Sequence, residues 1–129
     1  MKLYSVKILL PFLCLFVLGS AYPRMTGEEI GKYIQKKLKR NNQVLRINAK
    51  KLGDEGVAYL AGSSILKTVS TLIIYKGHFG DEGVRALAKS KNLDQLTALY
   101  LENNNITDLG VEYISRSKSL SKLKILNLY

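Results

Sequence analysis

Few side chains in this sequence are of the kinds that carry chemistry, and their spacing assembles no reactive site. The only histidine is His78 and the only cysteine is Cys14, so a zinc site or a nucleophile paired with a base is not supported. The acidic pairs Asp54-Glu55 and Asp81-Glu82 resemble general acid–base pairs. Each pair, however, stands at the same place in a repeated motif, at the expected start of a helix, where carboxylates act as caps. We therefore predict a protein that is not an enzyme and uses no metal or cofactor.

The acidic pairs recur because the chain is built from a repeat of 27 residues. The string GDEGV begins at Gly53 and again at Gly80, and TDLGV begins at Thr107. Apolar residues keep the same register in columns, which are Leu45, Leu72, Leu99 and Leu126; Ile47, Ile74, Leu101 and Leu128; Leu52, Phe79 and Ile106; Val57, Val84 and Val111; Leu60, Leu87 and Ile114; Leu66, Leu93 and Leu120. Self-similarity at a fixed spacing indicates a repeat architecture, whose units bury a continuous core by stacking.

Each unit has the pattern of a short strand followed by a helix. The segment 99–101 alternates apolar and polar side chains, as a strand with one buried face does. Thr107 or Asp108 can cap the helix, and Val111 and Ile114 supply its inward-facing stripe. A strand and a helix in every unit predict parallel strands joined by right-handed crossovers.

The segment from Leu96 to Ile106, LxxLxLxxNxI, resembles the consensus of the leucine-rich repeat family. Its continuation DxGVxxI is similar to the ribonuclease-inhibitor-like subclass, in which each unit carries a full helix. The resemblance covers residues 42–129, as three units and a terminal strand. It implies an α/β solenoid, a short horseshoe with parallel strands on the concave face and helices on the convex face. The asparagine column departs from the family pattern, because only Asn104 fills it while Lys50 and Gly77 stand in the other units.

Residues 1–21 have the three parts of a secretory signal peptide. Lys2 and Lys7 precede an apolar run at 8–18, and Gly19-Ser20-Ala21 offers small residues for cleavage after Ala21. We predict a secreted or periplasmic protein without a stable membrane anchor after cleavage. An uncleaved N-terminal anchor is the alternative.

Residues 26–40 align with the helical half of a unit, and we predict an N-terminal capping segment at 22–41 whose helix runs from Thr26 to Arg40. The chain has 20 Lys and Arg against 10 Asp and Glu, a net charge of +10. Part of this excess lies in the helix, at Lys32, Lys36, Lys37, Lys39 and Arg40. Because no aromatic residues for base stacking are interleaved with them, we interpret the cluster as a solvated face and predict no nucleic-acid partner.

The strand positions between the buried columns are the candidate partner-binding residues. Outward positions begin each strand at Val44, Thr71, Ala98 and Ile125. Tyr and Arg further along the strands are favoured interface anchors, although Tyr also simply suits strands. We predict a concave binding face that comprises Arg46, Ile73, Tyr75, Tyr100, Glu102, Asn127 and Tyr129.

Together these features predict an exported, non-enzymatic module for protein–protein interaction. Its partner is a protein, and a host protein is one candidate, because exported repeat proteins of this kind are common in bacteria that interact with hosts. The alternative is a truncated or split repeat protein, acting as a structural fragment that self-associates through the unpaired strand edge at 123–129.

Overall fold

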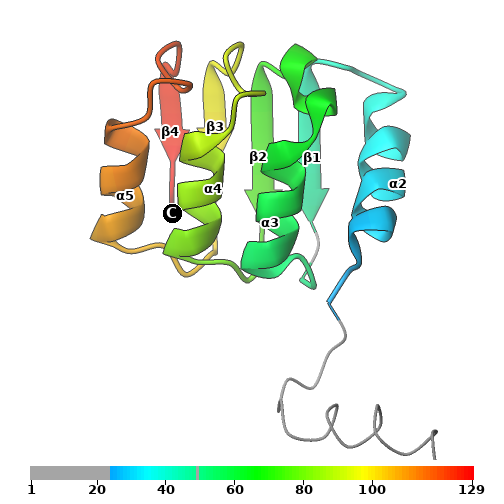
Figure 1. Ribbon diagram of the computed structural model, residues 1–129, viewed down its shortest axis with the longest axis horizontal. Helices are drawn as coiled ribbons and strands as arrows, with labels where there is room; N and C mark the ends of the chain where they lie inside the picture. The colour runs from blue at the N-terminus through cyan, green and yellow to red at the C-terminus, as the bar shows by residue number, and fades with distance from the viewer. Residues whose placement is uncertain (1–23, 49) are drawn as a thin grey trace, which may run out of the picture.

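The computed structural model describes residues 24–48 and 50–129, and the predicted signal peptide lies outside them. The elements in chain order are α2 (Gly27–Leu38), β1 (Val44–Asn48), α3 (Gly53–Gly62), the 3₁₀ helix η1 (Ser64–Thr68), β2 (Thr71–Tyr75), α4 (Asp81–Lys89), β3 (Ala98–Tyr100), α5 (Asp108–Ser115) and β4 (Ile125–Asn127). The strands form one parallel sheet in the order β1-β2-β3-β4. Helices α3, α4 and α5 lie side by side against one face, and α2 stands at the β1 end (Figure 1). The predicted α/β alternation with parallel strands is confirmed.

Equivalent residues of the units pair directly across the sheet. Leu45 pairs with Leu72, Leu72 with Leu99, and Leu99 with Leu126. Since side chains alternate between the two faces of a strand, this register sends the whole leucine column toward the helices. The opposite face of the sheet is left for the residues between the columns.

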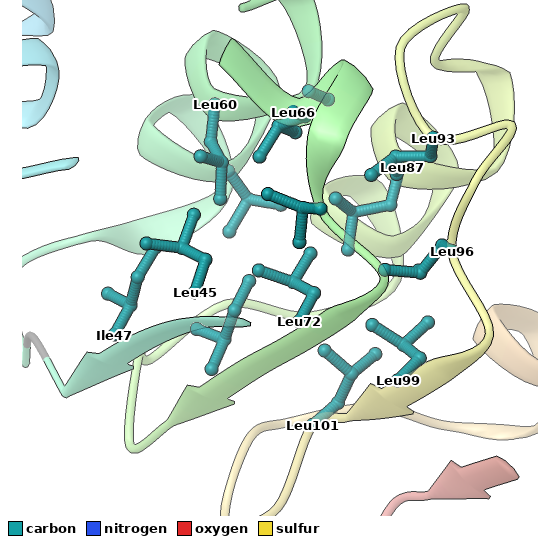
Figure 2. Close-up of a cluster of buried hydrophobic side chains, with 14 of the residues drawn as sticks. Leu45, Ile47, Leu60, Leu66, Leu72, Leu87, Leu93, Leu96, Leu99 and Leu101 are labelled. Carbon is teal, nitrogen blue, oxygen red and sulfur yellow. The ribbon is translucent and has the colours of Figure 1, made fainter. Parts of the chain in front are cut away.

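The core lies between the sheet and the helix layer. Leu45, Leu72 and Leu99 are completely buried, as are Leu60 and Leu87 from the helices facing them. Figure 2 shows these side chains interdigitating with leucines from the segments that return to each strand. Each fully buried leucine contributes about 1.5–3 kcal/mol, so the apolar columns account for most of the cohesion between units.

Helix α2 closes the β1 end of the core. Its N-terminus carries a capping box, in which the Thr26 side chain accepts from the N–H of Glu29 and the Glu29 carboxylate accepts from the N–H of Thr26 at 2.7 Å. Ile30 and Ile34 are buried, and the basic residues predicted to face solvent are exposed. The helix is slightly shorter than the Thr26–Arg40 segment expected, with Thr26 as its N-cap.

Val111 and Ala98 differ from the expected burial pattern. Val111 is 40% exposed although Val57 and Val84 are buried, because within the described residues nothing packs on the far side of α5. Ala98 was expected to point outward, yet it is only 7% exposed. It lies between Thr71 and Ile125 on the neighbouring strands, whose larger side chains leave a methyl group little contact with solvent.

Candidate functional site

The face of the sheet turned away from the helices brings the predicted binding residues together. Four of them form a row across all four strands, since Arg46 pairs with Ile73, Ile73 with Tyr100, and Tyr100 with Asn127. Strands in a sheet are about 4.8 Å apart, so the row is roughly 15 Å long. We call the surface made by Arg46, Ile73, Tyr75, Tyr100, Glu102, Asn127 and Tyr129 the open face.

A second row lies along the carboxyl ends of the strands. Tyr75 pairs with Asn48 at the end of β2, whereas Glu102 and Tyr129 follow the last residues of their strands. Asn127 links the two rows, because its Nδ2 donates to Glu102 Oε1 at 2.7 Å and its Oδ1 accepts from the N–H of Tyr129 at 3.1 Å. Tyr129 is 98% exposed, so it packs little against the rest of the open face.

Lys76 joins this surface, although the alternation of the strand does not predict it. Its Nζ lies 5.0 Å from the centre of the Tyr75 ring, a cation–π contact. The residue has a positive φ of 52°, which turns the chain at the end of β2. The sequence does place Lys76 directly after Tyr75. The alternation of side chains along a strand, however, predicts that Lys76 points to the opposite face from Tyr75. The turn overrides that pattern.

The open face is suited to binding and carries no group arranged for bond-making. Tyr75 and Tyr100 are half-buried, which holds each ring while leaving one side accessible, and Arg46 is exposed. Large, stiff, amphipathic side chains of this kind bind protein surfaces at a small cost in side-chain entropy. His78 is exposed in the turn after β2. Over residues 24–48 and 50–129, no group of three or more His, Cys, Asp or Glu could hold a metal ion.

Asp54 and Asp81, at the starts of α3 and α4, are structural, but they do not cap the helices on which they stand. Asp54 Oδ1 accepts from the N–H groups of Gly80 at 2.9 Å and Gly83 at 2.8 Å, both at the start of the next helix. Asp81 repeats the contact one unit later, with the N–H groups of Thr107 and Gly110. The expected capping role thus acts between units.

Hydrogen bonds from Thr107 lower the pKa of Asp81 below its ordinary value. The largest cause is the Thr107 hydroxyl, which donates to Asp81 Oδ2 at 2.6 Å, and the N–H groups of Thr107 and Gly110 act in the same direction. Asp81 is therefore held as a carboxylate, which is the form that accepts all three hydrogen bonds.

Asn104 compensates for the missing asparagine in the preceding unit. Its Oδ1 accepts from the N–H of Gly77 at 2.8 Å, and its Nδ2 donates to the carbonyls of Ile74, Leu101 and Glu102. A single side chain therefore ties the turn after β3 to the turn after β2.

The segment with the most complete motif also matches a known family. Residues 96–115, which run from the turn before β3 to the end of α5, match the model of a leucine rich repeat. The match supports a relationship of this segment to the leucine-rich repeat family. No curated protein and no solved structure matches the chain at a significant level. In the part of the chain that the structure describes, no helix is long and apolar enough to cross a membrane.

The parallel sheet with helices on one face is consistent with a fold of the leucine-rich repeat type. Leucine-rich repeats generally serve as interaction modules for proteins and are not themselves catalytic. The matched unit contributes Tyr100 and Glu102 to the open face.

Proposed function

We propose that this protein is an exported leucine-rich repeat module that binds a protein partner through the open face. The units form a short solenoid of the ribonuclease-inhibitor-like kind, with a 27-residue period and the open face as its concave side. The proposal extends the repeat character of residues 96–115 to the whole of residues 42–129.

The row Arg46, Ile73, Tyr100 and Asn127 carries the proposal. It presents a cation, an alkyl group, a phenol and an amide in register on one surface, which is the mixture found at protein interfaces. The neighbouring Tyr75 and Lys76 extend this surface without adding a reactive group. The partner is a protein, and host proteins remain one candidate class.

Site-specific photocrosslinking tests the binding surface. A photoreactive phenylalanine replaces Tyr100 on the open face or Lys89 on the exposed side of α4, and each variant is incubated with candidate host-cell proteins. We expect a discrete crosslinked product from position 100 that is suppressed by Arg46→Ser and Tyr75→Ser in the same chain. Crosslinks from position 89 alone would show that the partner binds the helix layer instead.

The export part of the proposal rests on residues 1–21. Cleavage after Ala21 leaves an N-terminal Tyr22, which intact-mass measurement of the exported protein detects. Retention of Met1 in a protein found only in the cytosol would contradict export without affecting the open face.

The alternative function, a structural fragment that self-associates, has one observation in its favour. Ile125 and Leu126 of β4, the last strand of the sheet, are 49% and 38% exposed. An exposed apolar edge strand invites pairing with another chain. Light scattering of the wild type and of Leu126→Lys distinguishes a self-associating fragment from a monomeric binding module. If both the wild type and Leu126→Lys are monomers, the result argues against the fragment hypothesis.

A further inference from the structure

The helix layer holds an aromatic ring in the groove between α2 and α3. Tyr59 of α3 lies against α2 at Gly27 and Gly31. A Cβ added to Gly27 would lie 2.6 Å from the Tyr59 ring, and one added to Gly31 would lie 3.5 Å from the Tyr59 hydroxyl oxygen. The ring therefore fills the space that the two glycines leave. Because Tyr59 is 49% exposed, it covers this groove from the solvent side.

Tyrosine recurs at this position of the repeat in α5 but not in α4. Tyr113 stands two periods after Tyr59, is half-buried and packs against the core. Ala86 stands one period after Tyr59. Since alanine has no ring, α4 lacks the side chain with which α3 covers the groove beside it.

An open groove of about 360 Å³ lies between α3 and α4. Ala58 and Ala86 contribute its apolar lining, and Asp54 lines it near the start of α3. Asp54 and Ala58 stand one period after the two glycines of α2, so this groove corresponds residue by residue to the one that holds Tyr59. The carboxylate of Asp54 is bound to the start of α4, which leaves the free space over the two alanines.

The two ends of this groove carry opposite charges. Glu55 and Glu82 line the end at the helix N-termini, where each makes one exposed ion pair that contributes little in water. Arg85 also lines the groove, but its guanidinium is the one paired with Glu82, at 3.2 Å. Lys89 lines the opposite end, and Lys91 lines its continuation. A cation is therefore attracted to the first end and an anion to the second, with apolar surface between them.

We propose that this groove is a second binding site, which takes an aromatic side chain of a partner protein. The ring packs on the methyl groups of Ala58 and Ala86, as Tyr59 packs on α2. A basic residue on one side of the ring lies beside the two glutamates, and an acidic residue on the other side lies beside Lys89. The chemistry of the occupant is inferred from the chain itself, because a tyrosine fills the equivalent groove one unit earlier.

An aromatic anchor suits a groove of this size and charge. Aromatic side chains bury about 150–250 Å² each, and tyrosine is among the preferred anchors of protein interfaces. The charged ends fix the direction of the bound segment, since the reverse direction would set like charges against each other. The groove belongs to the helix layer and is separate from the open face, which lies on the other side of the sheet (Figure 1).

Peptide selection tests this proposal on a chain whose open face is disabled. A phage-displayed library of random dodecapeptides is panned on the full chain carrying Arg46→Ser and Tyr75→Ser. We expect the enriched peptides to carry an aromatic residue between a basic and an acidic one. In fluorescence anisotropy, the leading peptide should bind the wild type and this variant equally. Ala86→Tyr fills the groove and should weaken binding by about tenfold or more, as loss of a buried aromatic anchor does.

Two further variants control for the added tyrosine. Lys36→Tyr places the same side chain at an exposed position of α2 and should leave the affinity unchanged. Lys89→Glu reverses the charge at one end without filling the groove and should weaken binding about tenfold. Lys89→Glu also keeps the test decisive if circular dichroism shows that Ala86→Tyr does not fold.

Four results would overturn the proposal. They are the absence of any enriched peptide, enriched peptides without an aromatic residue, wild-type affinity in a folded Ala86→Tyr, and wild-type affinity in Lys89→Glu. The first result is also the one expected if residues of the same chain filled the groove. Because Lys89 lines the groove, a crosslink from position 89 that persists in Arg46→Ser and Tyr75→Ser reports this site and not the open face. Failure of either site is therefore visible separately.

Discussion

The carboxylate of Asp81 accepts the backbone N–H of Gly110 at 3.0 Å, although the two residues belong to different helices. Asp81 is the first residue of α4, and Gly110 is the third residue of α5. The first N–H groups of a helix have no partner within it, and here the preceding unit supplies one. Formation of the N-termini of α4 and α5 therefore depends on the unit before each helix, which couples the stability of neighbouring units.

Removal of this carboxylate should destabilise the protein measurably. Asp81→Ala deletes the acceptor for the Thr107 hydroxyl and for the N–H groups of Thr107 and Gly110. We expect a loss of about 1–3 kcal/mol in the free energy of unfolding, measured by urea denaturation. Glu82→Ala is the control, because this neighbouring carboxylate makes only an exposed pair with Arg85 and should change stability by less than about 0.5 kcal/mol. Equal effects of the two substitutions would contradict the role of the cap.

The same contact predicts how stability depends on pH. The folded-state pKa of Asp81 is lowered from 3.8, first by the Thr107 hydroxyl and then by the backbone N–H groups. A lowered pKa means that the stabilisation is fully present above pH 3.8 and is lost as pH falls below this value through the folded-state pKa. The difference in unfolding free energy between the wild type and Asp81→Ala should therefore shrink between neutral pH and strong acid. The pKa of Glu29 is also lowered, but Glu29 is present in both proteins, so its contribution cancels in the difference between their unfolding free energies.

The strand register could be predicted from the sequence, because a period-two pattern repeated at equal spacing leaves one alignment that buries every leucine column. The sequence could not predict which helix each aspartate caps. Spacing shows that Asp54 and Asp81 are equivalent, but it does not show whether the side chain turns toward its own helix or the next. The recurrent glycine two residues after each aspartate was the available signal, since it marks a close approach by something outside the helix.

Predictions from the columns were least accurate near the last unit. Val57 and Val84 are covered by the helix of the following unit, whereas no helix of the described residues packs on α5, so Val111 is 40% exposed. The residues of the open face could be predicted from the sequence wherever side chains alternate regularly along a strand. Lys76 was missed because its positive φ breaks that alternation.

Gly110→Ala should be destabilising even though alanine favours helices. The added Cβ would lie 2.6 Å from both Asp81 Oδ1 and Ile106 Cγ2, so the cap or the packing of α5 must shift. We expect a loss of about 1–3 kcal/mol, as for other overpacked sites. Gly62→Ala, at the end of α3, meets nothing within 4 Å and should stabilise the protein slightly. Thermal unfolding of both variants measures the contrast, and a stable Gly110→Ala would show that Asp81 does not approach α5 so closely.

Tyr100 and Leu101 are adjacent in the chain, but truncation should destabilise the protein far more at Leu101 than at Tyr100. Leu101 is completely buried in the core, whereas Tyr100 is half-buried on the open face. Leu101→Ala should cost about 2–5 kcal/mol through the lost apolar contacts and the cavity left behind. Tyr100→Ala should change the free energy of unfolding by no more than about 1 kcal/mol, because its ring is free on one side. Both values come from urea denaturation under the same conditions. If the two substitutions destabilise the protein equally, Tyr100 contributes to packing and is not available to a partner.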